Sequence, residues 1–268
     1  MDYGLWTVDY RLWTILIQVH TLHPLLKEGM QKLENKIVLI TGGSKGIGYG
    51  VAEVLMREKM KVAITSRSQE AAEEAAARLN QPGIGEAMGI GADVRDLSLQ
   101  EKAVERIIQQ WGALDVLIAN AGIGYFGSIE SLTPEQWRET IDTNLTGVFY
   151  SVKASLGALK KSKGYIITMA SLAGTNFFAG GSAYNASKFG LVGFTQAMML
   201  DVRQDGVKVT TIMPGSVATY FNNRQPSPQD AWKIQPEDLG EMVADLLRMH
   251  PRTLPSKIEV RPSIPPKG

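Results

Sequence analysis

The strongest constraint on the fold is a regular alternation of strand-like and helix-like segments from Lys36 onward. Seven short, mostly apolar runs are typical of buried strands. They cover residues 37–41, 61–66, 86–92, 115–119, 165–170, 207–213 and 257–260. The segments with helical character cover residues 47–58, 69–79, 97–111, 134 into the 150s, 182–205 and 237–247. Because strands that alternate with such helices pair in parallel through right-handed crossovers, the pattern predicts a doubly wound α/β sandwich with helices on both faces.

Length and composition fit one domain of this kind. The chain has 268 residues, of which 44% are hydrophobic and 21% are charged, which is ordinary for a globular protein and too apolar for a disordered one. We see no internal repeat and no linker that would separate a second domain. The sequence therefore predicts a single domain over residues 30–268, preceded by an extension of residues 1–29.

The extension has its own pattern. Its apolar side chains recur at alternating steps of three and four, which would place them on one face of a helix. Its most apolar run, residues 12–19, is far shorter than the ~20 residues of a membrane-spanning helix. Asp2 argues against a secretory signal, and the scarcity of basic residues argues against a helix on a membrane surface. We expect a helix packed on the body or on a neighbouring subunit, with a dispensable extension as the alternative and membrane contact as the least favoured.

Charge and residue usage exclude several classes of function. Lys and Arg number 28 against 27 Asp and Glu, so nothing points to a nucleic acid as partner. Cysteine is absent, which excludes a thiol nucleophile, a Cys-ligated metal and a disulfide, and fits a reducing, cytoplasmic location. The three histidines lie at positions 20, 23 and 250, in the extension and just before a proline, so we expect neither a His-based triad nor a metal site.

A glycine-rich loop separates the first predicted strand from the first predicted helix. It reads Thr41-Gly42-Gly43-Ser44-Lys45-Gly46-Ile47-Gly48. Glycines at such a junction allow a sharp turn and the close approach of a pyrophosphate to the positive end of the helix. Lys45 does not stand in the frame of a nucleoside-triphosphate loop. The loop therefore predicts a dinucleotide site, and with it a Rossmann-like domain.

The end of the second predicted strand indicates which dinucleotide is bound. NAD-binding proteins usually place Asp or Glu there, for the 2′-hydroxyl of the ribose. Here the strand ends in Ser66 and Arg67, and the next carboxylate is Glu70. The Arg67 guanidinium, with Lys45 of the loop and the Ser66 hydroxyl, could instead hold a 2′-phosphate. We expect NADP(H) to be preferred over NAD(H), with a merely solvated arginine as the alternative.

Three residues of the second half are candidates for the chemistry. Tyr184 and Lys188 are four residues apart, on one face of the predicted helix 182–205. A lysine one turn away can lower the pKa of a phenol, which then gives or takes a proton near neutral pH. Ser171 directly follows the fifth predicted strand, at the edge where such sheets bind ligands, and could orient a carbonyl group.

From about residue 34 onward the chain resembles the short-chain dehydrogenase/reductase family. Beyond the glycine loop, the motifs that carry the resemblance are Asp93-Val94, Asn120-Ala121-Gly122, Asn144, Ser171, Tyr184-Asn185-Ala186-Ser187-Lys188 and Pro214-Gly215-Ser216-Val217-Ala218-Thr219. The likeness is to members of the 3-oxoacyl-(acyl-carrier-protein) reductase type. It implies a seven-stranded parallel sheet and hydride transfer between a nicotinamide ring and a carbonyl or alcohol carbon.

The resemblance also implies a role for each motif. Tyr184 would be the proton donor in reduction, Ser171 would hold the carbonyl oxygen, and Lys188 would bind the nicotinamide ribose and tune the phenol. Asn144 would hold a water that links Lys188 to a proton relay. Adenine contacts are implied for Asp93 and Val94, contacts on the cofactor side of the fourth strand for Asn120 and Gly122, and carboxamide contacts for Val217 and Thr219. Further cofactor contacts are implied for Gly42, Ser44, Gly46, Ile47, Gly48, Ala121, Pro214 and Gly215. Asp93 and Asn120 could instead only cap backbone groups.

Two departures from the family leave the substrate open. The crossover after Pro214-Gly215 is short, and its polar segment 222–228 is turn-prone and expected to move. The N-terminal extension is longer than the usual lead-in. The residues expected to line the pocket are Leu172, Phe177, Phe178, Tyr125 and Phe126. These side chains favour an apolar ketone, such as a 3-oxoacyl, steroid-like or cyclic one, although core packing would explain Phe177 and Phe178 equally well.

Two further expectations concern assembly and competing functions. The Met198-Met199 pair lies on the side of helix 182–205 that forms a dimer interface in relatives, so we expect a homodimer or homotetramer. An acyl-transfer enzyme would need a Ser-x-x-Lys motif, which the sequence lacks. The serious alternative is a nucleotide sensor or scaffold on the same fold, which would bind NADP(H) without turnover.

Overall fold

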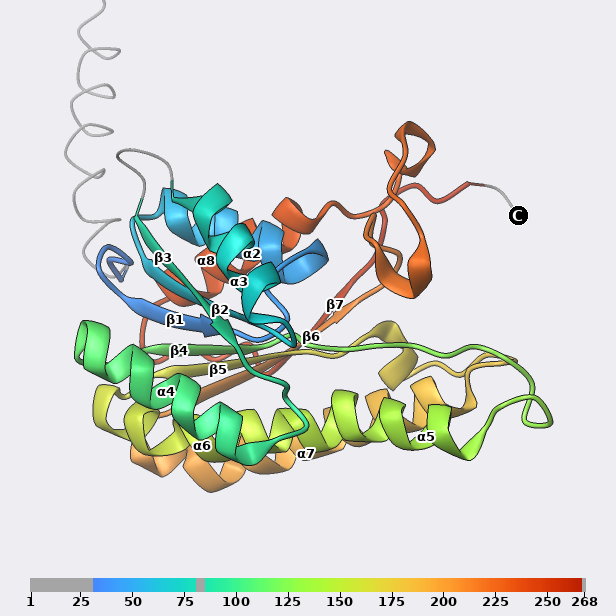
Figure 1. The fold of residues 1–268 in the computed structure, drawn as a ribbon, viewed down its shortest axis with the longest axis horizontal. Coiled ribbons are helices and arrows are strands. Elements are labelled where there is room, and N and C mark those ends of the chain that lie inside the picture. Colours follow the sequence, from blue (N-terminus) through green and yellow to red (C-terminus); the bar gives the residue numbers. More distant parts are fainter. Residues whose placement is uncertain (1–30, 81–84, 267–268) are drawn as a thin grey trace, which may run out of the picture.

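The computed structural model describes residues 31–80 and 85–266, and within them the predicted parallel α/β architecture is confirmed (Figure 1). Seven strands form one sheet in the order β3-β2-β1-β4-β5-β6-β7, and all neighbours are parallel. The extension of residues 1–29 lies outside the described residues. A search of the described part of the chain finds no helix long and apolar enough to cross a membrane.

The strands are short and largely buried, as expected for a parallel sheet covered on both faces. They are β1 Ile37–Ile40, β2 Lys61–Ser66, β3 Glu86–Gly91, β4 Val116–Ala119, β5 Tyr165–Met169, β6 Lys208–Pro214 and β7 Lys257–Val260. Every residue of β1, β4 and β5 is buried, whereas β7, at one edge, alternates between exposed and half-buried residues. The predicted ranges differ from these by one residue at most at either end.

Helices pack on both faces of the sheet (Figure 1). On the upper face in Figure 1 lie α2 Gly46–Arg57, α3 Gln69–Leu79 and α8 Pro236–Arg248, and on the lower face lie α4 Leu97–Trp111, α5 Pro134–Ile141, α6 Gly147–Ser162 and α7 Ser182–Val202. Because successive strand residues point to opposite faces, each face has its own core. Val38 and Ile40 of β1 belong to the upper core, whereas Ile37 and Leu39 belong to the lower one.

The helix predicted from residue 134 into the 150s is interrupted. It begins as predicted, where the Thr133 hydroxyl accepts a hydrogen bond from Gln136 N. Residues Asp142–Thr146 then form a turn of π-helix before α6 continues. Such a turn accommodates an extra residue and is frequent at functional sites. It contains Asn144, whose side chain is completely buried.

The order of the strands reverses between β1 and β4, since the chain first builds β2 and β3 on one side and then β4 to β7 on the other. Doubly wound sheets bind ligands at such a reversal, beyond the carboxyl ends of the strands. The loops after β1, β4, β5 and β6 therefore meet at this edge, on the right in Figure 1. The crossover from β6 to α8 contains two short 3-10 turns, Phe221–Asn223 and Pro228–Asp230, which overlap the segment predicted to be turn-prone.

Candidate functional site

Asn120, which follows β4, ties β4 to the end of β1 at the point of reversal. Its backbone N–H donates to Thr41 Oγ1 at 3.0 Å, and its side-chain amide donates to the carbonyl oxygens of Thr41 and Gly42 at 3.0 and 3.1 Å. Ala121 N also donates to Thr41 Oγ1, at 3.1 Å. The Asn120 side chain is thus engaged with the backbone of the glycine loop, which is the structural role that the sequence left open for it.

The glycine loop presents bare backbone at the start of α2. Gly42 has a φ of +65°, and a Cβ there would lie 2.9 Å from Ala121 Cα, so a larger residue would displace the loop from β4. Lys45 precedes α2 and provides no side-chain cap. The first N–H groups of α2 are therefore free to bind an anion in the positive field of the helix N-terminus. The loop fits the pyrophosphate of a dinucleotide.

A polar cavity of about 520 Å³ lies beside the loop. Its lining comes from the loop, the end of β2 and one face of α3, and consists of Ser44, Lys45, Ser66, Arg67, Ser68, Ala71, Glu74 and Arg78. The loop residues and the β2 residues predicted to bind the cofactor are therefore brought together. Three of the lining side chains are cationic and one is anionic, so the cavity attracts a phosphate group.

Arg78 was not predicted as a site residue. It donates to the Ser44 carbonyl at 3.4 Å, and its guanidinium lies 5.3 Å from the centre of the Tyr49 ring. Residues 71, 74 and 78 share one face of α3, which is the helical spacing that could have revealed it.

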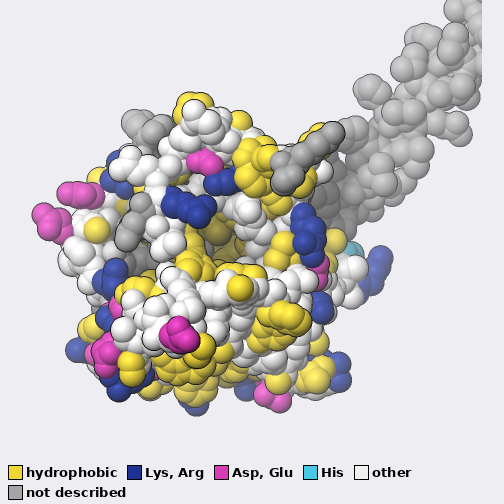
Figure 2. Space-filling view, turned by 90° about the vertical axis from the view of Figure 1, so that its right-hand side faces the viewer, with side chains coloured by type: hydrophobic (Ala, Val, Ile, Leu, Met, Phe, Trp, Pro, Cys, Tyr) yellow, Lys and Arg dark blue, Asp and Glu magenta, His cyan; other side chains and the backbone are white. Residues whose placement is uncertain are grey.

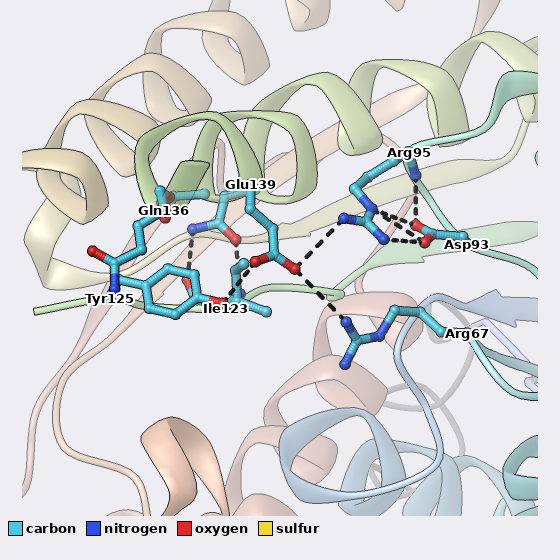
Figure 3. A network of polar contacts seen from close by, with 9 residues as sticks. Arg67, Asp93, Arg95, Ile123, Tyr125, Gln136 and Glu139 are labelled. Atoms are coloured by element: carbon cyan, nitrogen blue, oxygen red, sulfur yellow. Dashed lines mark hydrogen bonds and ion pairs between the residues drawn. The ribbon is translucent and has the colours of Figure 1, made fainter. Parts of the chain in front are cut away.

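A network of polar contacts runs from this cavity to α5 (Figure 3). Glu139 lies 3.9 Å from Arg67 and 3.5 Å from Arg95, and it accepts a hydrogen bond of 2.6 Å from the Tyr125 hydroxyl. Arg95 in turn binds Asp93, with the shortest contact at 2.6 Å. This pairing lowers the pKa of the Asp93 carboxyl. The carboxylate that was expected to contact adenine is thus held by a neighbouring arginine.

Ser171, Tyr184 and Lys188 come together beyond the carboxyl ends of β5 and β6. The Lys188 ammonium donates to the Met169 carbonyl at 2.9 Å and lies 5.7 Å from the centre of the Tyr184 ring. The Ser171 hydroxyl donates to the Pro214 carbonyl at 3.4 Å and also makes a hydrogen bond with the Tyr184 side chain. The three residues predicted to carry the chemistry are therefore neighbours.

Their surroundings shift both pKa values. Burial lowers the pKa of Lys188 to about 8 and raises the pKa of Tyr184 above its ordinary value, an effect that the hydrogen bond with Ser171 opposes. The net shift of the phenol's pKa is therefore opposite to the predicted one. The phenol is enclosed by the protein, and the nearby lysine, which donates to the Met169 carbonyl, does not offset the effect of that burial.

Asn144 lies close to the same lysine. Its side-chain oxygen accepts from Ile123 N at 2.8 Å, and its amide donates to Ile123 O at 2.8 Å and to Ser187 Oγ at 3.0 Å. A Cβ at Gly122 would lie 3.3 Å from Asn144 Oδ1 and 3.6 Å from Lys188 Nζ, so bare backbone separates the two side chains. The π-helical turn thus places Asn144 near Lys188, and its role in holding a water stays a prediction.

A second cavity, of about 480 Å³, opens beside Ser171 and Tyr184. Its lining is mostly apolar and consists of Ser171, Leu172, Ala173, Asn176, Phe178, Tyr184, Gly215, Ser216, Trp232, Arg261, Pro262 and Pro265. Figure 2 faces this edge of the molecule and shows a hollow with hydrophobic side chains in and below it and with Lys and Arg side chains above it. A small apolar molecule that enters this cavity would meet both hydroxyls.

Only some of the residues predicted to line the pocket do so. Leu172 and Phe178 line it. Phe126 lies edge-on to the Tyr184 ring, with 5.4 Å between the ring centres. Phe177 is 84% exposed and is not part of the lining. Tyr125 also lies outside the lining and is turned to α5 (Figure 3).

Other residues near Tyr184 or in the cavity wall were missed because they belong to no motif. Phe221 of the crossover after β6 lies 5.6 Å from the Tyr184 ring, and Trp232 of the same crossover lines the cavity. Arg261 and Pro262 come from the segment after β7. Isolated aromatic residues in a loop were the one signal in the sequence, and only the fold shows what they surround.

The motif after β6 connects the two cavities. Gly215 lines the apolar cavity, and its N–H donates to the Val260 carbonyl at 2.8 Å. Val217 pairs with the returning part of the crossover. Thr219 Cβ lies 3.6 Å from the place that a Cβ would take at Gly46, so this segment reaches the glycine loop.

Three of the remaining predicted cofactor residues also make packing contacts. Val94 is buried, and Ile47 packs on the core beneath α2 and α8. A Cβ at Gly48 would lie 2.6 Å from Asn120 Nδ2, so glycine is required for the clamp on the loop.

Comparison with known proteins agrees with this arrangement. A family model described as short chain dehydrogenase matches residues 36–230. A 3-oxoacyl-(acyl-carrier-protein) reductase of Vibrio harveyi is 37% identical over 188 residues, which are 70% of this chain and 75% of that protein.

Two solved structures are similar throughout the domain. An alcohol dehydrogenase from the archaeon Thermococcus sibiricus, complexed with 5-hydroxy-NADP, is 29% identical with a TM-score of 0.81, over 88% of this chain and 100% of that one. A short chain dehydrogenase from Burkholderia cenocepacia J2315, in complex with NADP, is 30% identical with a TM-score of 0.78, over 86% of this chain and 98% of that one.

Proposed function

The chain belongs to the short-chain dehydrogenase family and is an oxidoreductase that acts on alcohols or carbonyl compounds with a nicotinamide cofactor, and we propose that it prefers NADP(H) and uses Tyr184 as general acid and base. The single observation that carries the proposal is the pair of cavities at one sheet edge. One is rich in cations and lies beside the glycine loop, and the other is apolar and holds the Ser171 and Tyr184 hydroxyls.

The preference for NADP(H) rests on the charges of the first cavity. Lys45, Arg67 and Arg78 line it, and no carboxylate stands at the end of β2 to bind a free ribose hydroxyl. The present partner of Arg67 is Glu139, at 3.9 Å, and the Arg67 side chain is well exposed. Because an exposed ion pair of this kind is weak, a phosphate dianion would compete for Arg67 successfully. The two similar structures solved with NADP or its derivative support the same preference.

The proton chemistry is assigned to the second cavity. The cofactor, when bound, would supply a hydride to the carbonyl carbon or accept one from the alcohol. Ser171 would donate a hydrogen bond to the substrate oxygen, and the Tyr184 hydroxyl would give that oxygen a proton in reduction and take it back in oxidation. The raised pKa keeps Tyr184 protonated at neutral pH, which suits reduction. Lys188, 5.7 Å from the ring centre, would stabilise the phenolate that remains.

The test is the loss of NADPH absorbance with a panel of ketones, aldehydes and 3-oxoacyl thioesters, with NADH in parallel. Turnover that is faster with NADPH at low cofactor concentration is the expected result. Tight NADPH binding without oxidation of NADPH by any member of the panel would favour the sensor or scaffold instead. Equal KM values for NADPH and NADH would remove the cofactor preference but leave the reductase.

Replacing Arg67 by serine is expected to raise the KM for NADPH about tenfold while the KM for NADH changes little. The reason is that the two cofactors differ only in the 2′-phosphate, which Arg67 is proposed to bind. One charge-assisted contact in an open cavity contributes about the free energy that a tenfold change in KM represents. Steady-state kinetics with both cofactors measure it. Arg106→Ser, an exposed arginine of α4 outside the cavity, is the matched control. A similar rise in both KM values would contradict the assignment.

A homo-oligomer is also proposed, on partly different residues from those first considered. Met198 is 6% exposed and packs in the lower core, so it is not available for an interface. Phe149 of α6 and Phe189 and Leu200 of α7 are exposed instead, at 41%, 43% and 53%. Apolar side chains gathered on adjacent helices are typical of an interface between copies.

We therefore expect light scattering to give a mass two or four times the monomer's 29.3 kDa, and Leu200→Glu to shift it toward the monomer. The exposed Glu241 of α8, on the opposite face of the sheet, gives a control in Glu241→Lys. A wild-type protein that stays at 29.3 kDa would remove the proposed assembly.

A further inference from the structure

The apolar cavity has one charged residue in its wall, and from this we infer the class of substrate: a carbonyl compound with a carboxylate remote from the reacting carbon, bound by Arg261. This inference rests on the proposed reductase activity. It concerns the part of the pocket wall that comes from the segment after β7, which carries none of the family motifs.

The cavity wall combines the two hydroxyls with a single charge. Ser171 and Tyr184 provide the hydroxyls, while Trp232, Arg261 and Pro262 come from segments more than forty residues later in the chain. Every other lining residue is apolar or uncharged, so a ligand there meets one full charge, and it is positive. Pockets of this size are specific mainly through a few polar groups set in apolar walls.

The Arg261 backbone is held in place by the sheet. Residue 260 ends β7, and its carbonyl accepts a hydrogen bond of 2.8 Å from Gly215 N. Pro262 follows directly, and its Cδ lies 3.4 Å from the place that a Cβ would take at Gly215. The proline ring fixes its own φ and restricts the residue before it to extended backbone. Arg261 is thereby anchored to the same carboxyl edge of the sheet that carries Ser171.

The Arg261 guanidinium is available for a ligand. Its present partner is Glu259, at 3.0 Å, with side chains that are 58% and 41% exposed. The two residues are two apart and share one side of the strand, and a pair this exposed contributes little free energy. A ligand carboxylate, brought beside the guanidinium by an apolar body in the cavity, would displace Glu259 at small cost.

The ammonium of Lys233, the neighbouring cation, is not available to a ligand carboxylate in the same way. Its ammonium lies 5.6 Å from the centre of the Trp232 ring and pairs with Asp230 at 2.5 Å. The side chains of Lys233 and Asp230 are only 16% and 20% exposed. Lys233 is therefore engaged with Asp230 and outside the lining, while Arg261 remains the exchangeable charge.

The experiment compares matched pairs of acid and ester. The probes are 4-oxopentanoate, 6-oxoheptanoate and 8-oxononanoate, each with its methyl ester, so that charge changes while the ketone and the chain length do not. We expect the wild-type enzyme to have a KM for at least one acid about tenfold below that of its ester. The length that gives the largest ratio measures the span from the reacting hydroxyls to the arginine.

Variants at position 261 identify the cause. Arg261→Gln is expected to abolish the acid preference by raising the KM for the acid alone, and Arg261→Lys to retain part of it, because a lysine keeps the charge but loses the two-pronged contact. Arg252→Gln, an exposed arginine in the loop before β7, is the matched control. Added salt should raise the KM for the acid and leave that of the ester unchanged, which a purely structural role of Arg261 would not produce.

Failure of this inference can be distinguished from failure of the proposed function. Esters reduced as well as acids, with no change in Arg261→Gln, would overturn the inference and leave the reductase intact. Calorimetric titration of the NADP⁺-loaded enzyme with the same pairs measures binding without turnover. If no ketone is reduced, the proposed function fails, and the calorimetric preference for acid over ester still decides the role of Arg261.

Discussion

Tyr184→Phe is expected to lower kcat by about 10²- to 10⁴-fold, which is the range that a positioned general acid contributes. The substitution removes one oxygen and leaves the ring, whose contacts with Phe126 and Phe221 at 5.4 and 5.6 Å do not involve the hydroxyl. Fold and cofactor binding should therefore persist. NADPH oxidation with the best ketone gives kcat, and quenching of protein fluorescence by NADPH gives the dissociation constant.

Tyr125→Phe is the matched control for that experiment. It also deletes a tyrosine hydroxyl, but this hydroxyl is bound to Glu139 at 2.6 Å and lies outside the apolar cavity. We expect kcat near the wild-type value for this variant. A Tyr184→Phe enzyme within about tenfold of the wild-type rate would mean that another group transfers the proton.

Lys188→Met is expected to lower activity by about 10²-fold or more and, at neutral pH, to make the protein more stable. The wild-type lysine is buried with a pKa of about 8, against 10.5 for a free lysine, so keeping it charged in the folded state costs free energy. That gap corresponds to about 3 kcal/mol below pH 8, from which about 1 kcal/mol is subtracted for the lost hydrogen bond to the Met169 carbonyl.

The stability difference between Lys188→Met and the wild type depends on pH. Below pH 8 the lysine is charged in both states, so the full cost of burying the charge is present; above pH 10.5 it is neutral in both, and the cost is gone. The stability advantage of Lys188→Met over the wild type should therefore shrink by about 3 kcal/mol as the pH rises from 8 to 10.5. Urea unfolding of both proteins without cofactor, at closely spaced pH values, measures the difference.

Lys153→Met controls for the loss of any lysine, because residue 153 is exposed on α6. Its stability difference from the wild type should not change over the same pH range. A pH-independent difference for Lys188→Met would show that Lys188 is not held toward its neutral form in the folded protein.

Much of the fold and part of the site follow from local features of the sequence. Short apolar runs separated by helical segments predicted the strands to within a residue. This works because a strand that is buried on both faces of a parallel sheet is apolar at nearly every position. The glycine loop, and Tyr184 with Lys188 one turn apart, are likewise local, because helix geometry alone puts residues four apart on one face. Ser171 was found because it directly follows the predicted strand 165–170, whose end the sequence pattern indicates.

What only the tertiary structure decided comes from contacts between distant segments. The pKa of Tyr184 moves opposite to the direction predicted from Lys188, because enclosure by the protein outweighs one neighbouring charge that is itself buried. Arg78 lines the polar cavity only because α3 packs beside the glycine loop, and Arg261 lines the apolar cavity only because Gly215 pairs with the end of β7. Residue types and their periodicity are properties of the chain, whereas burial and the lining of a cavity are sums over the whole fold. The sequence by itself therefore determined the class of chemistry, and the packing decided the charges that the chemistry works with.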